Sequence, residues 1–241
     1  MKNHYSTLGF LLLVLLLASC GRSFKKIPID TIIKEIPKDQ VFSIVLNDMN
    51  VEGTFTNTYK HEYVVITEEQ PGQPEEQNYG WFEVSESYFE MHVNDMGMEL
   101  ASRGEDGKLS KGVNPPGYNN YIGNEKYGQW ENRGGHSFWA FYGQYAFMNS
   151  MFNMMTYPVR RSYYNDYRRG YYGTGRGYYG PMTGGRSYYG TNSSYTQSSR
   201  PRSSWSRNNS SFKQRVAGRT SRSGSRYSGS TSRSRGGGFG K

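Results

Sequence analysis

Residues 41–49 read Val-Phe-Ser-Ile-Val-Leu-Asn-Asp-Met, and this run decides the fold. Its side chains alternate between two faces, with Phe42, Ile44 and Leu46 on one and Val41, Ser43 and Val45 on the other. Apolar and β-branched residues at a period of two are typical of a β-strand. Asn47, Asp48 and Asn50, with Gly53 near them, predict a turn.

Later segments extend this pattern into a sheet. Residues 55–66 alternate again, and residues 80–93 and 96–101 predict a third and a fourth strand, whereas 68–78 predicts a polar loop. One apolar and one polar face suit an antiparallel sheet with a wet side. A sheet this small is stable only when its apolar side is covered. We therefore expect an α+β fold, in which an antiparallel β-rich domain over 41–113 is covered by later residues.

A connector rich in glycine and tyrosine is predicted over 114–136. Tyr118, Tyr121, Tyr127 and Trp130 lie within it. Their rings either pin the connector to the sheet or stack on sugar rings. Buried tyrosine and tryptophan side chains mostly serve packing, which favours the first interpretation.

One apolar helix is predicted over 137–158. Aromatic and methionine side chains recur there every three or four residues: Phe138, Tyr142, Tyr145, Met148, Phe152 and Met155. This is helical spacing, and Pro158 predicts the stop. The run 137–155 is apolar nearly all round, but its asparagine and glutamine residues argue against a membrane span. Three roles stay open: cover for the sheet, an interfacial membrane helix, or a contact surface for a partner.

Charge divides the chain into two parts. Residues 1–158 carry 12 Lys and Arg against 19 Asp and Glu, a net charge of −7. Residues 159–241 carry 17 Lys and Arg against one acid, a net charge of +16. The second part has few aliphatic side chains with which to build a core. We therefore predict a disordered, basic, low-complexity tail over 159–241.

The predicted tail repeats the unit Arg-(Gly/Ser)-Tyr-Tyr four times. Guanidinium groups pair with phosphates, and tyrosine rings stack on other rings or on guanidinium. The candidate polyanion-binding residues are Arg161, Arg169, Arg176, Arg186, Tyr163, Tyr171, Tyr178 and Tyr188. Two alternatives stay open: a solvated spacer without a ligand, and a tail that contacts the acidic surface of its own domain.

The N-terminus predicts export. Lys2 precedes an apolar run over 8–18, which is too short to span a bilayer, so residues 1–19 have the marks of a secretory signal peptide. Leu17-Ala18-Ser19-Cys20 closes the run, and Cys20 is the only cysteine. This ending resembles the lipobox of bacterial lipoproteins. The resemblance implies acylation of Cys20, a membrane anchor, and no cysteine left for a disulfide.

Residues 20–40 then form the anchor and tether, with a short helix or strand near 30–36 that Asp30 could cap. Gly21 and Arg22 stand where an aspartate would mark inner-membrane retention in the lipoprotein family, so the resemblance implies the outer membrane. A second resemblance covers Ser137-Phe138-Trp139, the aromatic and methionine run, and the Gly/Tyr/Ser/Arg tail. This layout is similar to that of uncharacterised envelope lipoproteins of the YgiB type, whose activity is unknown.

The sequence offers no support for catalytic or metal chemistry. His61 and His92 have no convergent partners at suitable spacing, and we expect surface or half-buried histidines. The acidic pairs at 68–69 and 75–76 predict a solvated loop. We predict no enzymatic activity, cofactor or metal site, and export argues against a nucleic-acid partner.

The expected function is therefore non-enzymatic binding or scaffolding at the cell envelope. A lipid anchor would supply the membrane contact, and the arginines and tyrosines would contact anionic polymers or headgroups. The alternative is an accessory subunit of a membrane protein complex that docks through 137–155.

Overall fold

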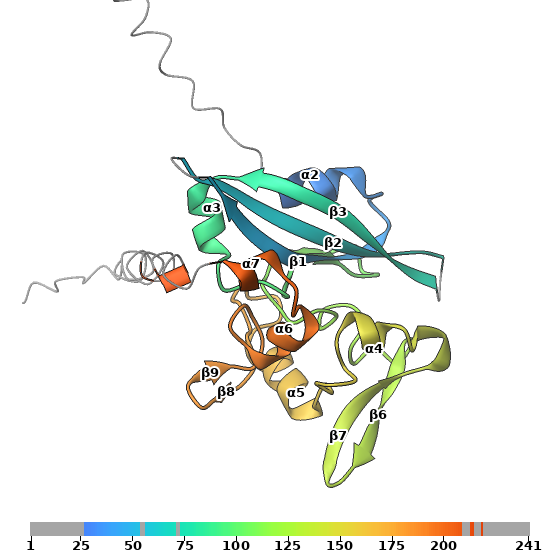
Figure 1. The fold of residues 1–241 in the computed structure, drawn as a ribbon. Coiled ribbons are helices and arrows are strands. Elements are labelled where there is room, and N and C mark those ends of the chain that lie inside the picture. The colour runs from blue at the N-terminus through green and yellow to red at the C-terminus, as the bar shows by residue number, and fades with distance from the viewer. Residues whose placement is uncertain (1–26, 54–55, 71–72, 209–212, 215–217, 219–241) are drawn as a thin grey trace, which may run out of the picture.

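The computed structural model describes residues 27–53, 56–70, 73–208, 213–214 and 218. A five-stranded antiparallel sheet forms its first half, in the order β3-β2-β1-β4-β5 (Figure 1). The strands are β1 (Val41–Glu52), β2 (Thr58–Gln70), β3 (Gln73–Val84), β4 (Glu99–Arg103) and β5 (Leu109–Ser110). The mixed α+β class is confirmed, and the run that begins at Val41 is the central strand.

Three boundaries in the sheet differ from expectation. The turn predicted at 47–50 is absent: β1 continues to Glu52, and its residues from Asp48 on pair with β2 after a register irregularity between Leu46 and Asp48. Residues 68–78 are largely strand rather than a polar loop: β2 continues to Gln70, and β3 starts at Gln73. The predicted strand over 80–93 ends at Val84, and helix α3 (Glu86–Met91) follows it. The Ser85 side chain accepts a hydrogen bond from the Tyr88 N–H at 3.2 Å and so caps this helix. Polar residues pair readily in an edge strand, because backbone hydrogen bonds hold the ladder and the side chains face solvent.

The sheet was expected to have one solvent-exposed face, but the first half of the central strand is buried on both faces. Every residue of Val41–Leu46 is buried. Helix α2 (Pro28–Glu35) lies above the sheet in Figure 1 with Ile29 and Ile32 buried, and most of the chain after β5 lies below it. The helix expected near 30–36 is thus present, but Ile27 rather than Asp30 occupies its N-cap, with Pro28 in the first turn.

The predicted helix over 137–158 is wrong. Residues 136–141 instead form β7 (His136–Phe141), which pairs with β6 (Gly128–Arg133). Gly134 and Gly135 close this hairpin with φ values of +56° and +77°, the left-handed backbone that a two-residue turn requires. Only η1 (Gly143–Tyr145) and α4 (Met148–Met151) are helical in the rest of the segment. The aromatic residues of this segment do recur at helical spacing. Backbone pairing with β6 nevertheless makes 136–141 a strand.

Disorder is also wrong for residues 159–208. This part contains α5 (Arg161–Gly170), β8 (Met182–Thr183), β9 (Arg186–Ser187), α6 (Ser194–Ser199) and α7 (Ser204–Arg207). Most of residues 209–241 lie outside the described chain, so the prediction stays a prediction there. Among the described residues, no helix is long and apolar enough to cross a membrane.

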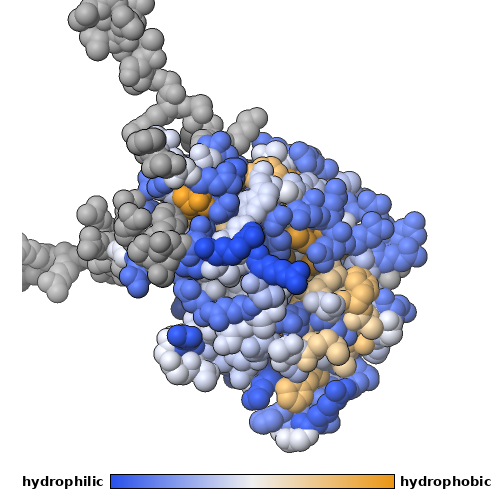
Figure 2. Space-filling model, viewed as in Figure 1, coloured by the Kyte–Doolittle hydropathy of each residue, from blue (hydrophilic) through white to orange (hydrophobic). Residues whose placement is uncertain are grey.

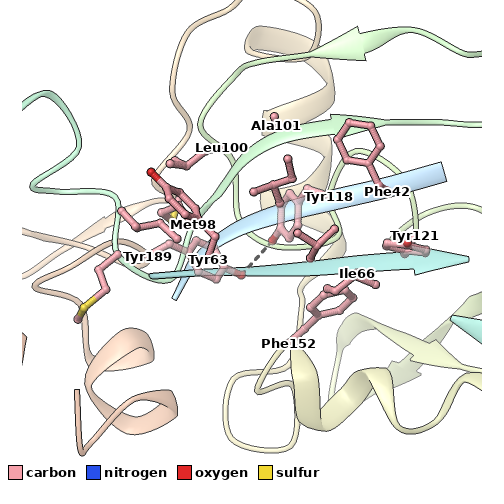
Figure 3. Packing of buried hydrophobic residues seen from close by; sticks show 14 of the residues in the cluster. Phe42, Tyr63, Ile66, Met98, Leu100, Ala101, Tyr118, Tyr121, Phe152 and Tyr189 are labelled. Carbon is pink, nitrogen blue, oxygen red and sulfur yellow. Dashed lines mark hydrogen bonds between the residues drawn. The ribbon is translucent and has the colours of Figure 1, made fainter. Parts of the chain in front are cut away.

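Tyrosines build the core that joins the two halves (Figure 3). In the connector, Tyr118, Tyr121 and Tyr127 are fully buried, as the pinning interpretation expects. From the predicted tail they are joined by Tyr167, Tyr178, Tyr189, Tyr195 and Trp205. Most of these hydroxyl groups find partners inside, and Tyr118 and Tyr189 share a hydrogen bond of 3.0 Å; the buried Tyr121 hydroxyl has no partner among the described residues. A phenol ring buries a large apolar area when its hydroxyl is paired, so a segment poor in aliphatic residues can still form a core.

Candidate anion-binding surface

The four repeats place their arginines outward and their tyrosines inward. Arg161 and Arg169 lie on α5, Arg176 lies in the loop after it, and Arg186 lies on β9; all four are exposed. Among the predicted ring partners, Tyr178 is buried, and Tyr163, Tyr171 and Tyr188 are half-buried. The arginines are therefore available to a ligand, whereas most of the ring area serves packing.

Ring contacts bring the repeats together in pairs. Tyr163 of the first repeat and Tyr188 of the fourth have ring centroids 5.4 Å apart. Tyr171 of the second and Tyr178 of the third are 4.9 Å apart. The Tyr178 hydroxyl donates to the Tyr163 carbonyl at 2.8 Å and so links the two pairs. Although the four repeats are unevenly spaced in the sequence, their tyrosine rings thus form one connected aromatic layer beneath the arginines.

Several guanidinium groups are held against aromatic rings. The Arg168 Cζ lies 3.6 Å from the centroid of Tyr172, and the Arg176 Cζ lies 5.1 Å from that of Tyr171. Arg161 stacks at 5.7 Å on Trp130 of β6. A stacked guanidinium keeps its N–H edges free for a phosphate or carboxylate while it loses side-chain freedom. Arg168 was missed by sequence reasoning because it lies outside the repeat unit, although it adjoins Arg169.

The surrounding charge is almost all of one sign. Residues 159–208 contain nine arginines and no lysine, and Asp166 is the sole acid among them. Asp166 pairs with Arg169 at 2.8 Å. None of Arg161, Arg176 and Arg186 forms an ion pair with a described residue. A cluster of unneutralised arginines gives a positive potential that attracts polyanions.

A cavity of about 720 Å³ lies beside this surface, between the β4–β5 turn, the connector and the loop after α5. Lys108, Lys111, Asn119 and Tyr172 are among its lining residues. The Asn119 amide donates to Glu99 Oε1 and to Ser102 Oγ, both at 2.8 Å. Its carbonyl oxygen accepts from the Tyr167 hydroxyl. The sequence could not reveal this cavity, because its walls come from segments as far apart as Val41 and Gly175.

The Glu99 carboxyl, which is bonded to the cavity-lining Asn119, is fully buried, and no ion pair joins it to another described residue. Burial raises its pKa, although hydrogen bonds with the side chains of Ser102, Ser43 and Asn119 and with the Gly117 N–H (3.3 Å) oppose the shift. Glu99 lies on β4, whereas Gly117 and Asn119 lie in the connector, so these hydrogen bonds hold the connector against β4. This structural role explains why the carboxyl group is buried.

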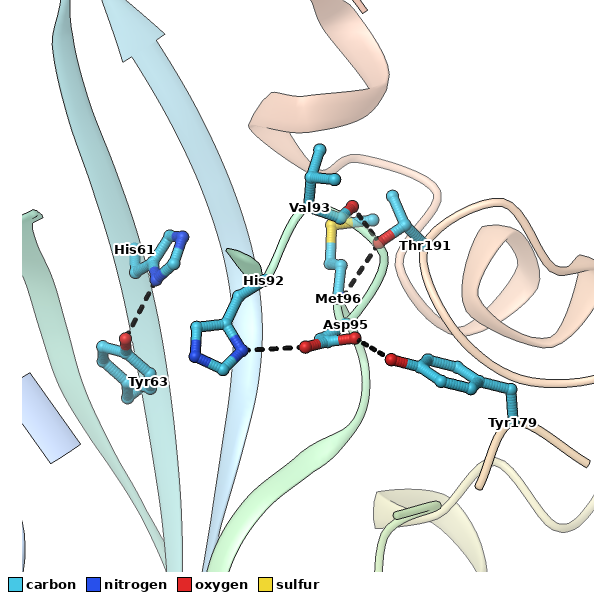
Figure 4. A network of polar contacts seen from close by, with 8 residues as sticks. All are labelled: His61, Tyr63, His92, Val93, Asp95, Met96, Tyr179 and Thr191. Carbon is cyan, nitrogen blue, oxygen red and sulfur yellow. Dashed lines mark hydrogen bonds and ion pairs between the residues drawn. The ribbon is translucent and has the colours of Figure 1, made fainter. Parts of the chain in front are cut away.

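A second polar network joins the sheet to the C-terminal half (Figure 4). His92 Nδ1 lies 2.8 Å from Asp95 Oδ2, and the Tyr179 hydroxyl donates to Asp95 Oδ1 at 2.6 Å. His61, expected to be surface or half-buried, is fully buried, with Nδ1 2.9 Å from the Tyr63 hydroxyl. Burial, and then the nearby His92, lower the pKa of His61 to about 3. The described chain gathers no three histidine, cysteine or acidic side chains that could hold a metal ion.

An exposed apolar patch lies elsewhere, around η1 and α4. Tyr142, Phe147 and Met155 are 40%, 42% and 82% exposed. Figure 2 shows hydrophobic surface gathered over this part of the molecule, with mostly hydrophilic surface around it. Large exposed apolar patches often mark contacts with other molecules.

The predicted lipidation site, Cys20, lies outside the described residues. No family model, no curated protein and no solved structure matches the chain.

Proposed function

We propose that this protein is a lipid-anchored component of the bacterial cell envelope, in the outer membrane, with a non-enzymatic binding or scaffolding role. Its ligands are anionic envelope polymers or headgroups, bound through an arginine surface that we define as Arg161, Arg168, Arg169, Arg176 and Arg186. The observation that carries the proposal is that folding of the repeats leaves the arginines exposed and some of them stacked on tyrosine.

The chemistry of this surface favours phosphate and carboxylate groups. Guanidinium forms paired hydrogen bonds with either group, and stacking on aromatic rings limits the rotamer entropy lost on binding. Each basic residue near an anionic surface contributes about 1 kcal/mol. Five arginines of one surface therefore provide useful affinity without a deep pocket.

The anchor supports the proposal through local concentration. Acyl chains on Cys20 would hold the protein at a bilayer, since two or more chains give stable attachment. Seven residues, 21–27, separate Cys20 from Pro28. Even fully extended, they span at most about 25 Å. The arginine surface would then search only the layer next to its membrane, where weak contacts gain from effective concentration.

The test replaces four of the arginines and leaves the tyrosine core intact. In the variant R161Q/R169Q/R176Q/R186Q, we expect affinity for phosphatidylglycerol vesicles and for lipopolysaccharide to fall by at least about tenfold, with a weaker salt dependence. The control K34Q/K38Q/K60Q removes three positive charges near α2 and on β2, away from the arginine surface and its neighbouring cavity, and should bind like the native protein. Binding that is equal in both variants and insensitive to salt would refute the proposed ligand class.

The anchor is tested separately by the intact mass of the mature chain. We expect removal of residues 1–19 and added acyl mass on Cys20. In C20S, both the acyl mass and flotation with membranes should disappear. A serine variant that is still trimmed and still floats would contradict the anchor.

A second candidate role, an accessory subunit of a membrane protein complex, is favoured by the exposed side chains of Phe147 and Met155. The docking element would be this patch and not a helix over 137–155. A photo-crosslinking amino acid at 155 should then capture one membrane protein. The same group at Met91, which is 68% exposed on α3, serves as the control. Equal capture from both positions would count against this role.

A further inference from the structure

The cavity beside the arginine surface contains a hydrogen-bond acceptor that no described residue satisfies. Asn120 lines this cavity and is only 8% exposed. Its amide nitrogen donates to the Phe42 carbonyl at 2.9 Å, to the Arg103 carbonyl at 3.2 Å and to Ser43 Oγ at 3.3 Å. Carbonyl oxygens only accept, so the nitrogen must face β1 and β4. Asn120 Oδ1 therefore lies on the cavity side, 3.3 Å from the place of a Cβ on the cavity-lining Gly104, and accepts no hydrogen bond from a described residue.

An aromatic ring and a cation stand at the same cavity. Tyr172 lines it and is 42% exposed. The Arg168 Cζ lies 3.6 Å from the centroid of this ring, and the Arg168 guanidinium forms no ion pair with another described residue. The stacked guanidinium thus presents its N–H edges to an anion next to the ring.

The other charges of the cavity wall are already paired. The ion pairs that involve lining residues are Glu105–Lys126 at 2.7 Å, Asp106–Lys108 at 3.8 Å and Lys111–Asp30 at 2.6 Å. The unneutralised charge at the cavity is therefore the positive charge of Arg168, which favours an anionic ligand at the Tyr172 end.

The size and the wall chemistry suit a sugar ring. The volume of about 720 Å³ lies within the range of about 300–1,000 Å³ that is typical of small-molecule sites. Neutral amide and hydroxyl groups, from Asn120, Asn124 and Ser110, share the wall with the Tyr172 ring. Sugar hydroxyls both donate and accept, and the C–H face of a sugar packs on an aromatic ring. A ligand without donors would leave Asn120 Oδ1 buried and unpaired, which is costly.

We infer that this cavity binds one acidic sugar unit of an anionic glycan, that is, a pyranose ring that carries a carboxylate or phosphate group. A ring hydroxyl donates to Asn120 Oδ1, the ring packs against Tyr172, and the anionic group pairs with Arg168. The inference rests on the proposed function and narrows its ligands to an acidic polysaccharide. The rest of the arginine surface remains for neighbouring units of the same glycan.

Calorimetric titration of the full chain in detergent tests the ligand class with four probes: glucuronate, glucose 6-phosphate, glucose and cyclohexanecarboxylate. Glucose lacks the charge, and cyclohexanecarboxylate keeps a ring and the charge but has no hydroxyl group. We expect the better of the two acidic sugars to bind at least about tenfold more tightly than either of these. The comparison of glucuronate with glucose 6-phosphate distinguishes a carboxylate from a phosphate. Equal binding of cyclohexanecarboxylate, or no binding of either acidic sugar at millimolar concentration, would overturn the inference.

Substitutions at the cavity wall test its place. In Gly104→Ala the new Cβ would shield Asn120 Oδ1 without touching the amide nitrogen, and the backbone of Gly104 is not left-handed. We expect acidic-sugar affinity to fall at least about tenfold, whereas Gly143→Ala, in open space away from the cavity, should bind like the native protein. Tyr172→Ala should lose about fivefold or more and Tyr172→Phe less than about twofold. Arg168→Gln should remove the preference for acidic over neutral sugar.

Failure of this site and failure of the proposed function can be told apart. Acidic-sugar binding that is unchanged in both Gly104→Ala and Tyr172→Ala would overturn the cavity site. The loss of vesicle and lipopolysaccharide binding in R161Q/R169Q/R176Q/R186Q would then still support the arginine surface. If that fourfold variant binds both ligands like the native protein, the proposed function fails, and the assignment of a glycan fails with it.

Discussion

Replacing Tyr178 with alanine tests whether the repeats belong to the core. Its side chain is 4% exposed, and its ring lies 4.9 Å from Tyr171, 5.6 Å from Tyr167 and 6.2 Å from Tyr118. Removing a buried aromatic side chain costs about 3–5 kcal/mol. Tyr178→Phe removes only the hydrogen bond to the Tyr163 carbonyl and should cost about 1 kcal/mol.

The assay is urea unfolding followed by tryptophan fluorescence. With a denaturant dependence of about 2 kcal/mol per molar urea, Tyr178→Ala should lower the midpoint by roughly 1.5–2.5 M, and Tyr178→Phe by about 0.5 M. Tyr172→Ala is the control within the same run of repeats, because Tyr172 is 42% exposed. Its main contact is the Arg168 guanidinium, and its loss should cost less than about 1 kcal/mol.

A single result would refute this reasoning. If Tyr178→Ala unfolds within about 0.5 M urea of the native protein, a change typical of surface substitutions, then residues 159–208 do not form a core. The prediction of a disordered tail would stand instead.

Three further predictions concern the rest of the core. The pKa of His61 is lowered to about 3, so the unfolded chain binds a proton that the folded chain does not between about pH 6.5 and pH 3. The free energy of unfolding should be unaffected above about pH 6.5 and should fall by up to roughly 5 kcal/mol between about pH 6.5 and pH 3. His61→Asn should reduce this pH dependence, as measured by urea unfolding at several pH values. Gly123→Ala should destabilise by about 2–4 kcal/mol, since its φ is +78° and a Cβ would lie 2.5 Å from the Tyr164 ring. Gly107→Ala, with φ +70° and open space, should cost only about 1–2 kcal/mol in thermal unfolding, and equal losses would contradict the packing. Asp48→Ala should cost about 1–3 kcal/mol, because its carboxylate accepts the first two backbone N–H groups of α7; an unchanged melting temperature would show that α7 does not dock on β1.

The strands around Val41 could be predicted because alternation is a local property. A period of two places Phe42 and Ile44 on one face wherever the strand goes, and the partner strands follow from the same pattern. The hairpin at 128–141 could also have been found, since Gly134-Gly135 is a turn signal between two short alternating runs. It was missed because Phe138, Tyr142 and Tyr145 satisfy helical spacing as well, and spacing alone cannot separate two periods over so few residues.

The candidate site, too, could be predicted only in part from the sequence. That Arg161, Arg169, Arg176 and Arg186 are exposed follows from the high cost of burying a guanidinium without a partner, so composition was enough to predict it. Whether the tyrosines are buried could not be predicted from the neighbouring residues, because a phenol ring is stable either in solvent or in a core.

The sequence by itself therefore determined the central strand, the charge division and the outward arginines, each of which depends on neighbouring residues or on solvation alone. Only the tertiary structure decided that the repeats fold. Tyr178 and Tyr189 are buried because Val113 and Tyr118, some seventy residues earlier in the chain, offer a backbone carbonyl and a hydroxyl group as their partners. Such pairing cannot be read from a local stretch, since the free energy comes from surface that two distant segments remove from water together.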